Sequence, residues 1–129
     1  MIKATRNQLG VAKNPYQTDA HRVLCVCSAG VLRSPTIANV LHHGFGYNTR
    51  SAGSCLDYAL IPVSEALLHW ADEIVFAESS NAHETESNYP GMLDNKTVYS
   101  LDLPDEYSWN DSGLKVLIGS RYRDKVAGL

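Results

Sequence analysis

A cysteine and an arginine stand at a spacing that suits the binding of an oxyanion. The five residues between Cys27 and Arg33 begin with three small ones, Ser28, Ala29 and Gly30. Small side chains let backbone N–H groups converge on an anion, and the guanidinium group of arginine is a planar fork that holds two of its oxygens. A thiol in the same field loses its proton more easily and becomes a nucleophile. The spacing therefore predicts a Cys27 thiolate facing a bound phosphoryl group.

The segments on either side of this loop are expected to position it. The apolar run at residues 23–26 predicts a strand buried on both faces of a parallel sheet. Pro35 fits the first turn of a helix with Ser34 as its cap, and the helix N-terminus adds positive potential. The Ser34 hydroxyl can also donate a hydrogen bond to the thiolate. The predicted phosphate-binding residues are Ser28, Ala29, Gly30, Val31, Leu32, Arg33 and Ser34.

The remaining pattern alternates strands with helices. Strands are predicted at residues 23–26, 49–53, 74–77 and 97–103, and helices after residue 34, around residues 63–70, at 79–88 and from residue 111 or 112. This order predicts an α/β fold, a single domain over residues 21–129 with a four-stranded parallel sheet flanked by helices. The phosphate loop is expected at the C-terminal end of the first strand. Residues 1–20 show no sustained period and are interpreted as an irregular N-terminal extension.

Composition restricts the partners. A net charge of −3 and a pI near 5.9 give no general attraction to nucleic acid or to an anionic membrane. The chain has no run of eighteen apolar residues, and its first twenty residues lack the apolar segment of a secretory signal. We therefore expect a cytoplasmic protein without a membrane or nucleic-acid partner.

Three cysteines, Cys25, Cys27 and Cys55, form an odd and sparse set. Such a set does not predict a disulfide framework, and the cysteine and histidine spacings match no zinc site. No metal or other cofactor is expected. A redox role for Cys25 or Cys55 is left open by the sequence.

Several segments together resemble one family. Residues 23–36, including Arg33-Ser34-Pro35, are similar to the strand, phosphate loop and helix start of the low-molecular-weight protein tyrosine phosphatases, most closely the short bacterial and phage-type members. Residues 50–53 resemble that family's S-A-G turn, residues 71–78 its next strand and residues 103–107 its general-acid loop. The resemblance implies a cysteine-dependent phosphomonoesterase, a protein-tyrosine-phosphatase-like hydrolase. Its substrate would be a phosphotyrosine-containing protein or another aryl phosphate, hydrolysed through a phosphocysteine intermediate with release of inorganic phosphate.

The resemblance also assigns roles to individual residues. Asp105 is the expected general acid, which protonates the departing tyrosyl oxygen. Asp102 is the alternative, although its place in the predicted strand favours a structural role. Ser51 matches the serine that braces the phosphate loop, and Tyr107 and Trp109 would form an aromatic wall for a phenyl ring.

Two positions depart from the family pattern, and two others are candidates for supporting roles. Gly30 stands where the family commonly has asparagine, whose side chain ties the loop to the serine matched by Ser51, so this brace must be lost or replaced. Glu106 replaces the usual proline after the acid, which loosens the acid loop and adds a negative charge. Glu78 is a candidate for orienting the loop, and Tyr58 for the opposite wall of the site.

Two other functions compete with a phosphatase. Arsenate reductases use the same loop and fold, but they need further cysteines for an oxidation relay. A catalytically silent phosphate-binding or phosphotyrosine-binding module is the second alternative. The presence of Cys27, Arg33 and Asp105 together argues against that module, because a binder needs neither the thiolate nor the proton donor. The sequence leaves the physiological substrate and the oligomeric state open.

Overall fold

The computed structural model describes residues 20–108 and 110–128. Four strands form one parallel sheet in the order β2-β1-β3-β4. Their bounds are β1 (Arg22–Cys27), β2 (Asn48–Gly53), β3 (Glu73–Phe76) and β4 (Thr97–Ser100). The expected four-stranded parallel sheet is confirmed. The predicted N-terminal extension, apart from Ala20, lies outside the described residues, and so does Trp109.

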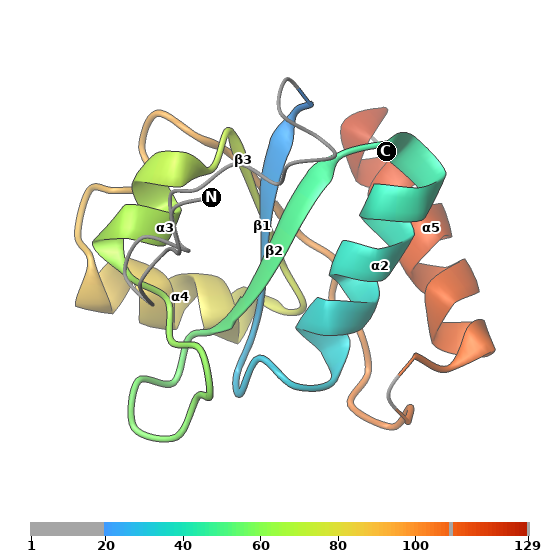
Figure 1. The fold of residues 1–129 in the computed structure, drawn as a ribbon, viewed down its shortest axis with the longest axis horizontal. Helices are drawn as coiled ribbons and strands as arrows, with labels where there is room; N and C mark the ends of the chain where they lie inside the picture. The colour runs from blue at the N-terminus through green and yellow to red at the C-terminus, as the bar shows by residue number, and fades with distance from the viewer. Residues whose placement is uncertain (1–19, 109, 129) are drawn as a thin grey trace, which may run out of the picture.

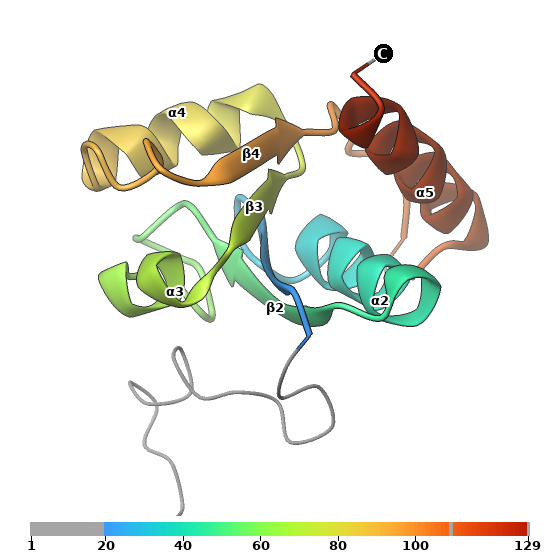
Figure 2. The ribbon, with the colours of Figure 1, turned by 90° about the horizontal axis from the view of Figure 1, so that it is seen from above.

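Helices cover both faces of this sheet (Figures 1 and 2). They are α2 (Arg33–Phe45), α3 (Glu65–Trp70), α4 (Ser79–Asn88) and α5 (Ser112–Val126). Figure 2 shows α2 and α5 on one face and α3 and α4 on the other. In the part of the chain that the structure describes, no helix has the length and apolar character needed to cross a membrane.

The direction of winding reverses at β1. The chain passes through α2 to reach β2 on one side of β1, and it later places β3 and β4 on the other side. In an open parallel sheet, the carboxyl ends of the two strands at such a reversal border a natural binding crevice. The loop that follows β1 lies at this point, as predicted.

The central strand β1 is buried on both faces. Val23 and Cys25 contribute to the core beneath α2 and α5, whereas Leu24 and Val26 contribute to the core beneath α3. All four side chains are fully buried. The alternation places successive residues in opposite cores, which is why the strand has a continuous apolar sequence.

Most predicted strand limits differ from the observed ones by one residue, and two predictions were wrong by more. β4 ends at Ser100 rather than at residue 103, because Asp102 adopts a left-handed backbone conformation with φ of 53° that interrupts a regular strand. Ser34 is not the helix cap: α2 begins at Arg33, with Leu32 at the N-cap position. The Ser34 hydroxyl points instead toward Cys27, and this contact belongs to the candidate active site.

Candidate active site

Cys27 is the last residue of β1, and its sulfur is surrounded by hydrogen-bond donors. Ser34 Oγ lies 3.3 Å from Cys27 Sγ, and the Gly30 N–H donates to the sulfur at 3.2 Å. The residue is only 3% exposed. Burial by itself raises the pKa of the Cys27 thiol, but the Ser34 hydroxyl and the N–H groups of Ser34, Gly30 and Leu32 together outweigh it and lower the pKa. The arrangement favours a thiolate, which is the form that attacks phosphorus.

The Arg33 side chain is buried next to this thiol and is held by two partners. It is 7% exposed. Its Nη1 donates to the backbone carbonyl of Leu103 at 3.1 Å and to Glu78 Oε2 at 3.2 Å. The hydroxyl of Ser80 and the guanidinium of Arg33 lower the pKa of Glu78, so this carboxyl stays charged. Two partners on one nitrogen fix the plane of the guanidinium group before an anion arrives. Glu78 thus helps to hold Arg33 in place, whereas its role in orienting the loop stays a prediction.

Asp105 approaches the same arginine from the loop after β4. Its Oδ1 lies 3.8 Å from Arg33 Nε, and the carboxylate is 73% exposed. The loop is tied down on both sides of Asp105: Leu103 N–H donates to Ala77 O at 2.8 Å, and Asn110 N–H donates to Thr36 Oγ1 at 3.1 Å. A carboxyl group on an anchored but exposed loop can reach the leaving oxygen of a phosphate ester.

Asp102, the alternative acid, is engaged elsewhere. Its carboxylate accepts a hydrogen bond from Ser79 Oγ at 3.3 Å, and its backbone carbonyl accepts one from Arg121. These contacts join the segment after β4 to the start of α4 and to the middle of α5. The geometry favours a structural role for Asp102.

The phosphate loop packs directly on the end of β2. Gly30 has φ of 78°, and a Cβ added there would lie 2.9 Å from Ala52 C and from Gly53 N. The next residue of the chain after β2 continues this contact, since Ser54 N–H donates to Cys27 O at 2.8 Å. Glycine at position 30 thus satisfies both a left-handed conformation and a close approach of two backbones.

A side-chain network joins the loop to α4. Asn81 Nδ2 donates to Ser28 Oγ at 3.1 Å and to Ser54 Oγ at 3.2 Å. Ser54 Oγ in turn donates to Glu84 Oε1 at 2.6 Å. Asn81 and Ser54 are both 1% exposed, so these hydrogen bonds form away from water. A buried polar group that lacks a hydrogen-bond partner costs more folding free energy than an exposed one.

Several solved structures that share this architecture are bacterial phosphatases. Vibrio vulnificus Wzb in complex with benzylphosphonate superposes with a TM-score of 0.66 and 18% identity over 85% of this chain and 99% of that one. A low molecular weight protein tyrosine phosphatase from T. tengcongensis gives a TM-score of 0.64 and 18% identity over 85% and 100% of the two chains. This chain has the low-molecular-weight protein tyrosine phosphatase fold. The YwlE arginine phosphatase from Geobacillus stearothermophilus also shares it, with a TM-score of 0.64 and 18% identity over 84% and 94% of the chains. No protein-family model and no curated protein matches the sequence.

Because Gly30 replaces the family's asparagine, the phosphate loop needs support from elsewhere. In this fold the support comes from direct packing of the loop on β2 and from the hydrogen bonds of Asn81. Ser51 lies on β2 opposite Cys25, and no hydrogen bond joins its side chain to the phosphate loop in residues 20–108. Backbone contact with Ala52 and Gly53 and the bonds from Asn81 support the loop instead. The bracing role of Ser51 stays a prediction.

Gly30→Ala is expected to destabilise the protein by about 1–3 kcal/mol, because the new Cβ would be strained at positive φ and would press on the backbone of β2. It should also weaken phosphate binding. Thermal unfolding with and without phosphate measures both effects. Gly44→Ala in α2 is the matched control: its Cβ would meet nothing within 4 Å, and we expect it to stabilise the helix by about 0.5–1 kcal/mol. Equal stability of the two variants would contradict the close packing of the loop.

The structure describes two of the three aromatic residues that were predicted to line the site, Tyr107 and Tyr58. Tyr107 is half-buried and packs against the core beneath α2 and α5. Its role as an aromatic wall stays a prediction, and the same role for Trp109 falls outside the described residues. Tyr58 is exposed; its backbone N–H donates to Cys55 O at 3.4 Å, and Cys55 in turn bonds Ser28 of the phosphate loop, so its role as the opposite wall stays a prediction.

The other two cysteines differ in their surroundings. Cys25 is fully buried, and burial, followed by the charges of Glu73 and Cys27, raises the pKa of its thiol well above the usual value. Cys55 is partly exposed and has a free thiol. Across the part of the chain that the structure describes, no three histidine, cysteine or acidic side chains gather to hold a metal ion.

Sequence analysis missed Asn81, Ser54 and Glu84. One signal pointed to Asn81: α4 begins with a capping box in which Glu78 and Asn81 each bond the backbone of the other. The box places Asn81 at the carboxyl edge of the sheet, next to the loop. No local pattern indicated the bond from Ser54 to Glu84, which are thirty residues apart.

Proposed function

We propose that the protein is a cysteine-dependent phosphomonoesterase that hydrolyses phosphotyrosine or another aryl phosphate through a phosphocysteine intermediate. The observation that carries the proposal is the convergence of three groups: the stabilised Cys27 sulfur, the buried Arg33 fork and the Asp105 carboxyl group 3.8 Å from that fork. The bound benzylphosphonate in Vibrio vulnificus Wzb supports an aromatic phosphoryl compound as the ligand class.

The first step transfers the phosphoryl group to sulfur. Cys27 Sγ attacks phosphorus and the bond from phosphorus to the aryl oxygen breaks. Arg33 and the loop N–H groups hold the non-bridging oxygens, whose charge they stabilise in the transition state. Asp105 gives its proton to the departing phenolate oxygen. The products are a phosphocysteine and a neutral phenol.

The second step releases phosphate. A water molecule attacks phosphorus on the side from which the phenol left, and Asp105, now ionised, takes one of its protons. The bond between sulfur and phosphorus breaks, and Cys27 leaves as the thiolate that its hydrogen bonds stabilise. Inorganic phosphate departs, and both Cys27 and Asp105 regain their starting protonation states.

The alternatives are less well supported. An arsenate reductase relay needs further accessible thiols; Cys25 is fully buried and its pKa is raised, which leaves the partly exposed Cys55 as the one candidate among the described residues. A silent binding module has no need for a stabilised thiolate. A cytoplasmic location is also part of the proposal, because a reducing compartment keeps the nucleophilic thiol free.

Turnover assays test the function directly. The purified protein is expected to hydrolyse both phosphotyrosine and an activated aryl phosphate, with rates unchanged by a metal chelator, because the chemistry proposed here needs no metal ion. A parallel assay with arsenate and a thiol reductant tests the alternative function, arsenate reduction. Loss of hydrolysis in chelator with recovery on adding a divalent ion, or reduction of arsenate without ester hydrolysis, would overturn the proposal.

A further inference from the structure

The loops around the candidate active site carry an unusual charge distribution. These loops follow the four strands at residues 28–32, 54–62, 77–78 and 101–111, and they contain no lysine, arginine or histidine. Among the described residues, Arg33 at the start of α2 contacts Leu103, and Arg121 of α5 contacts the carbonyls of Leu101 and Asp102. Their carboxylates are Asp57, Glu78, Asp102, Asp105, Glu106 and Asp111. A peptide that presents a phosphoryl group to Cys27 therefore meets loops rich in carboxylates beside the buried Arg33.

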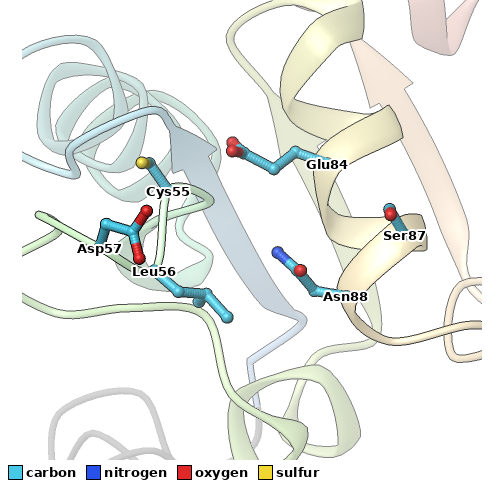
Figure 3. Close-up of a pocket in the computed structure, with 6 residues that line it drawn as sticks. All are labelled: Cys55, Leu56, Asp57, Glu84, Ser87 and Asn88. Carbon is cyan, nitrogen blue, oxygen red and sulfur yellow. The ribbon is translucent and has the colours of Figure 1, made fainter.

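A cleft opens on one side of this surface, between the loop after β2 and α4 (Figure 3). Its volume is about 370 Å³. Figure 3 shows Cys55 and Asp57 on the loop side, with Glu84 and Asn88 pointing toward them from the helix. The lining residues are Cys55, Leu56, Asp57, Glu84, Ser87 and Asn88. Two carboxylates, two neutral polar groups and no cation thus line a space that accommodates a long side chain.

The cleft adjoins the phosphate loop. Cys55 N–H donates to Ser28 O at 3.0 Å, so one wall of the cleft is hydrogen-bonded to the residue directly after Cys27. The opposite wall is linked to the same residue, because Glu84 accepts from Ser54, and Asn81 bonds both Ser54 and Ser28. A residue near the phosphorylated one in a bound peptide can therefore reach the cleft while the phosphoryl group occupies the loop.

We propose that this cleft binds a lysine or arginine side chain of the substrate, so that the enzyme prefers phosphotyrosine within basic segments. The inference rests on the phosphatase function proposed above, and it specifies the class of phosphotyrosine substrate that the enzyme prefers. A cationic group gains favourable interactions with Asp57 and Glu84, whereas an acidic segment is repelled by the surrounding carboxylates. Charge pairs at an accessible surface contribute modestly, so we expect a preference of about 3–10-fold in kcat/KM at low salt. The preference should shrink as salt screens the charges.

Three synthetic phosphotyrosine peptides of equal length test the inference, with lysine, glutamine or glutamate at the flanking positions. The expected order of kcat/KM is lysine, then glutamine, then glutamate. In Asp57→Asn, the ratio of the lysine peptide to the glutamine peptide should fall toward one. Asp124→Asn is the matched control, since it removes the same charge from an exposed position near the far end of α5 and should keep the wild-type ratio.

The outcomes separate the two proposals. Equal rates on the three peptides, or a preference for the glutamate peptide, would overturn the inference and leave the phosphatase function intact. A lysine preference that Asp57→Asn and Asp124→Asn both retain would overturn the cleft as its origin. Failure to hydrolyse any of the peptides or a small aryl phosphate would overturn the proposed function itself. The glutamine peptide is the internal reference for any general loss of activity in a variant.

Discussion

Cys27→Ser is expected to abolish hydrolysis, lowering turnover of phosphotyrosine by roughly 10⁴-fold or more, as in other enzymes that lose their nucleophile. The hydrogen bonds from Ser34 and Gly30 lower the pKa of a thiol enough to favour the thiolate, but a serine hydroxyl starts from a far higher pKa and remains protonated. Steady-state kinetics of the purified variant on phosphotyrosine and on an activated aryl phosphate measure the loss.

Phosphate binding and thiol chemistry provide the controls for this prediction. Cys27→Ser should still bind inorganic phosphate, because Arg33 and the loop N–H groups remain, and calorimetry can measure that affinity. In the wild type, alkylation of Cys27 should rise with pH around a midpoint below that of a free thiol, since the thiolate forms above a lowered pKa. Ser34→Ala removes a stabilising bond and should move this midpoint to higher pH. Retained hydrolysis by Cys27→Ser would eliminate the phosphocysteine mechanism.

Asp105→Asn is expected to slow hydrolysis of phosphotyrosine by about 10²–10⁴-fold, the usual contribution of a positioned general acid. An asparagine amide occupies the same space beside Arg33 but has no acidic proton to transfer to the leaving oxygen. The loss should depend on the leaving group. It should be large for phosphotyrosine, because a phenol with a pKa near 10 leaves poorly without a proton. It should be smaller for an activated aryl phosphate, whose oxygen departs as a stable anion. Rates of single turnover on the two substrates measure the difference.

Asp102→Asn is the matched control for the acid. It makes the same change three residues away, on a carboxylate that bonds Ser79. We expect it to reduce stability slightly and to slow both substrates to the same small extent. If Asp105→Asn lost no more activity on phosphotyrosine than on the activated ester, Asp105 would not be the acid.

The predictable part of the fold came from strong local patterns. The apolar run at the start of β1 identifies a strand buried on both faces. The polar segment 79–88, for which the sequence showed no apolar stripe, forms the short helix α4 that was expected there. The end of β4 was predicted less well. Its alternation continues to Leu103, and Leu103 still bonds Ala77, but the left-handed conformation of Asp102 ends the regular strand earlier. Side-chain periodicity reports which residues are buried and does not report a change of backbone conformation between them.

The sequence by itself determined the chemistry of the phosphate loop, and only the tertiary structure decided how that loop is held. Cys27 and Arg33 lie within one short segment between a strand and a helix, so their types and spacing are sufficient to predict convergent N–H groups, a thiolate and a guanidinium fork. The partners of Arg33 are Glu78 and Leu103, at sequence separations of 45 and 70 residues. These contacts depend on the strand order, which brings the carboxyl ends of β1, β3 and β4 to one edge, and no local pattern encodes that order. The fit of Gly30 against β2 and the acidic cleft beside α4 depend on the same long-range packing, because the surfaces that form them meet only when the sheet is complete.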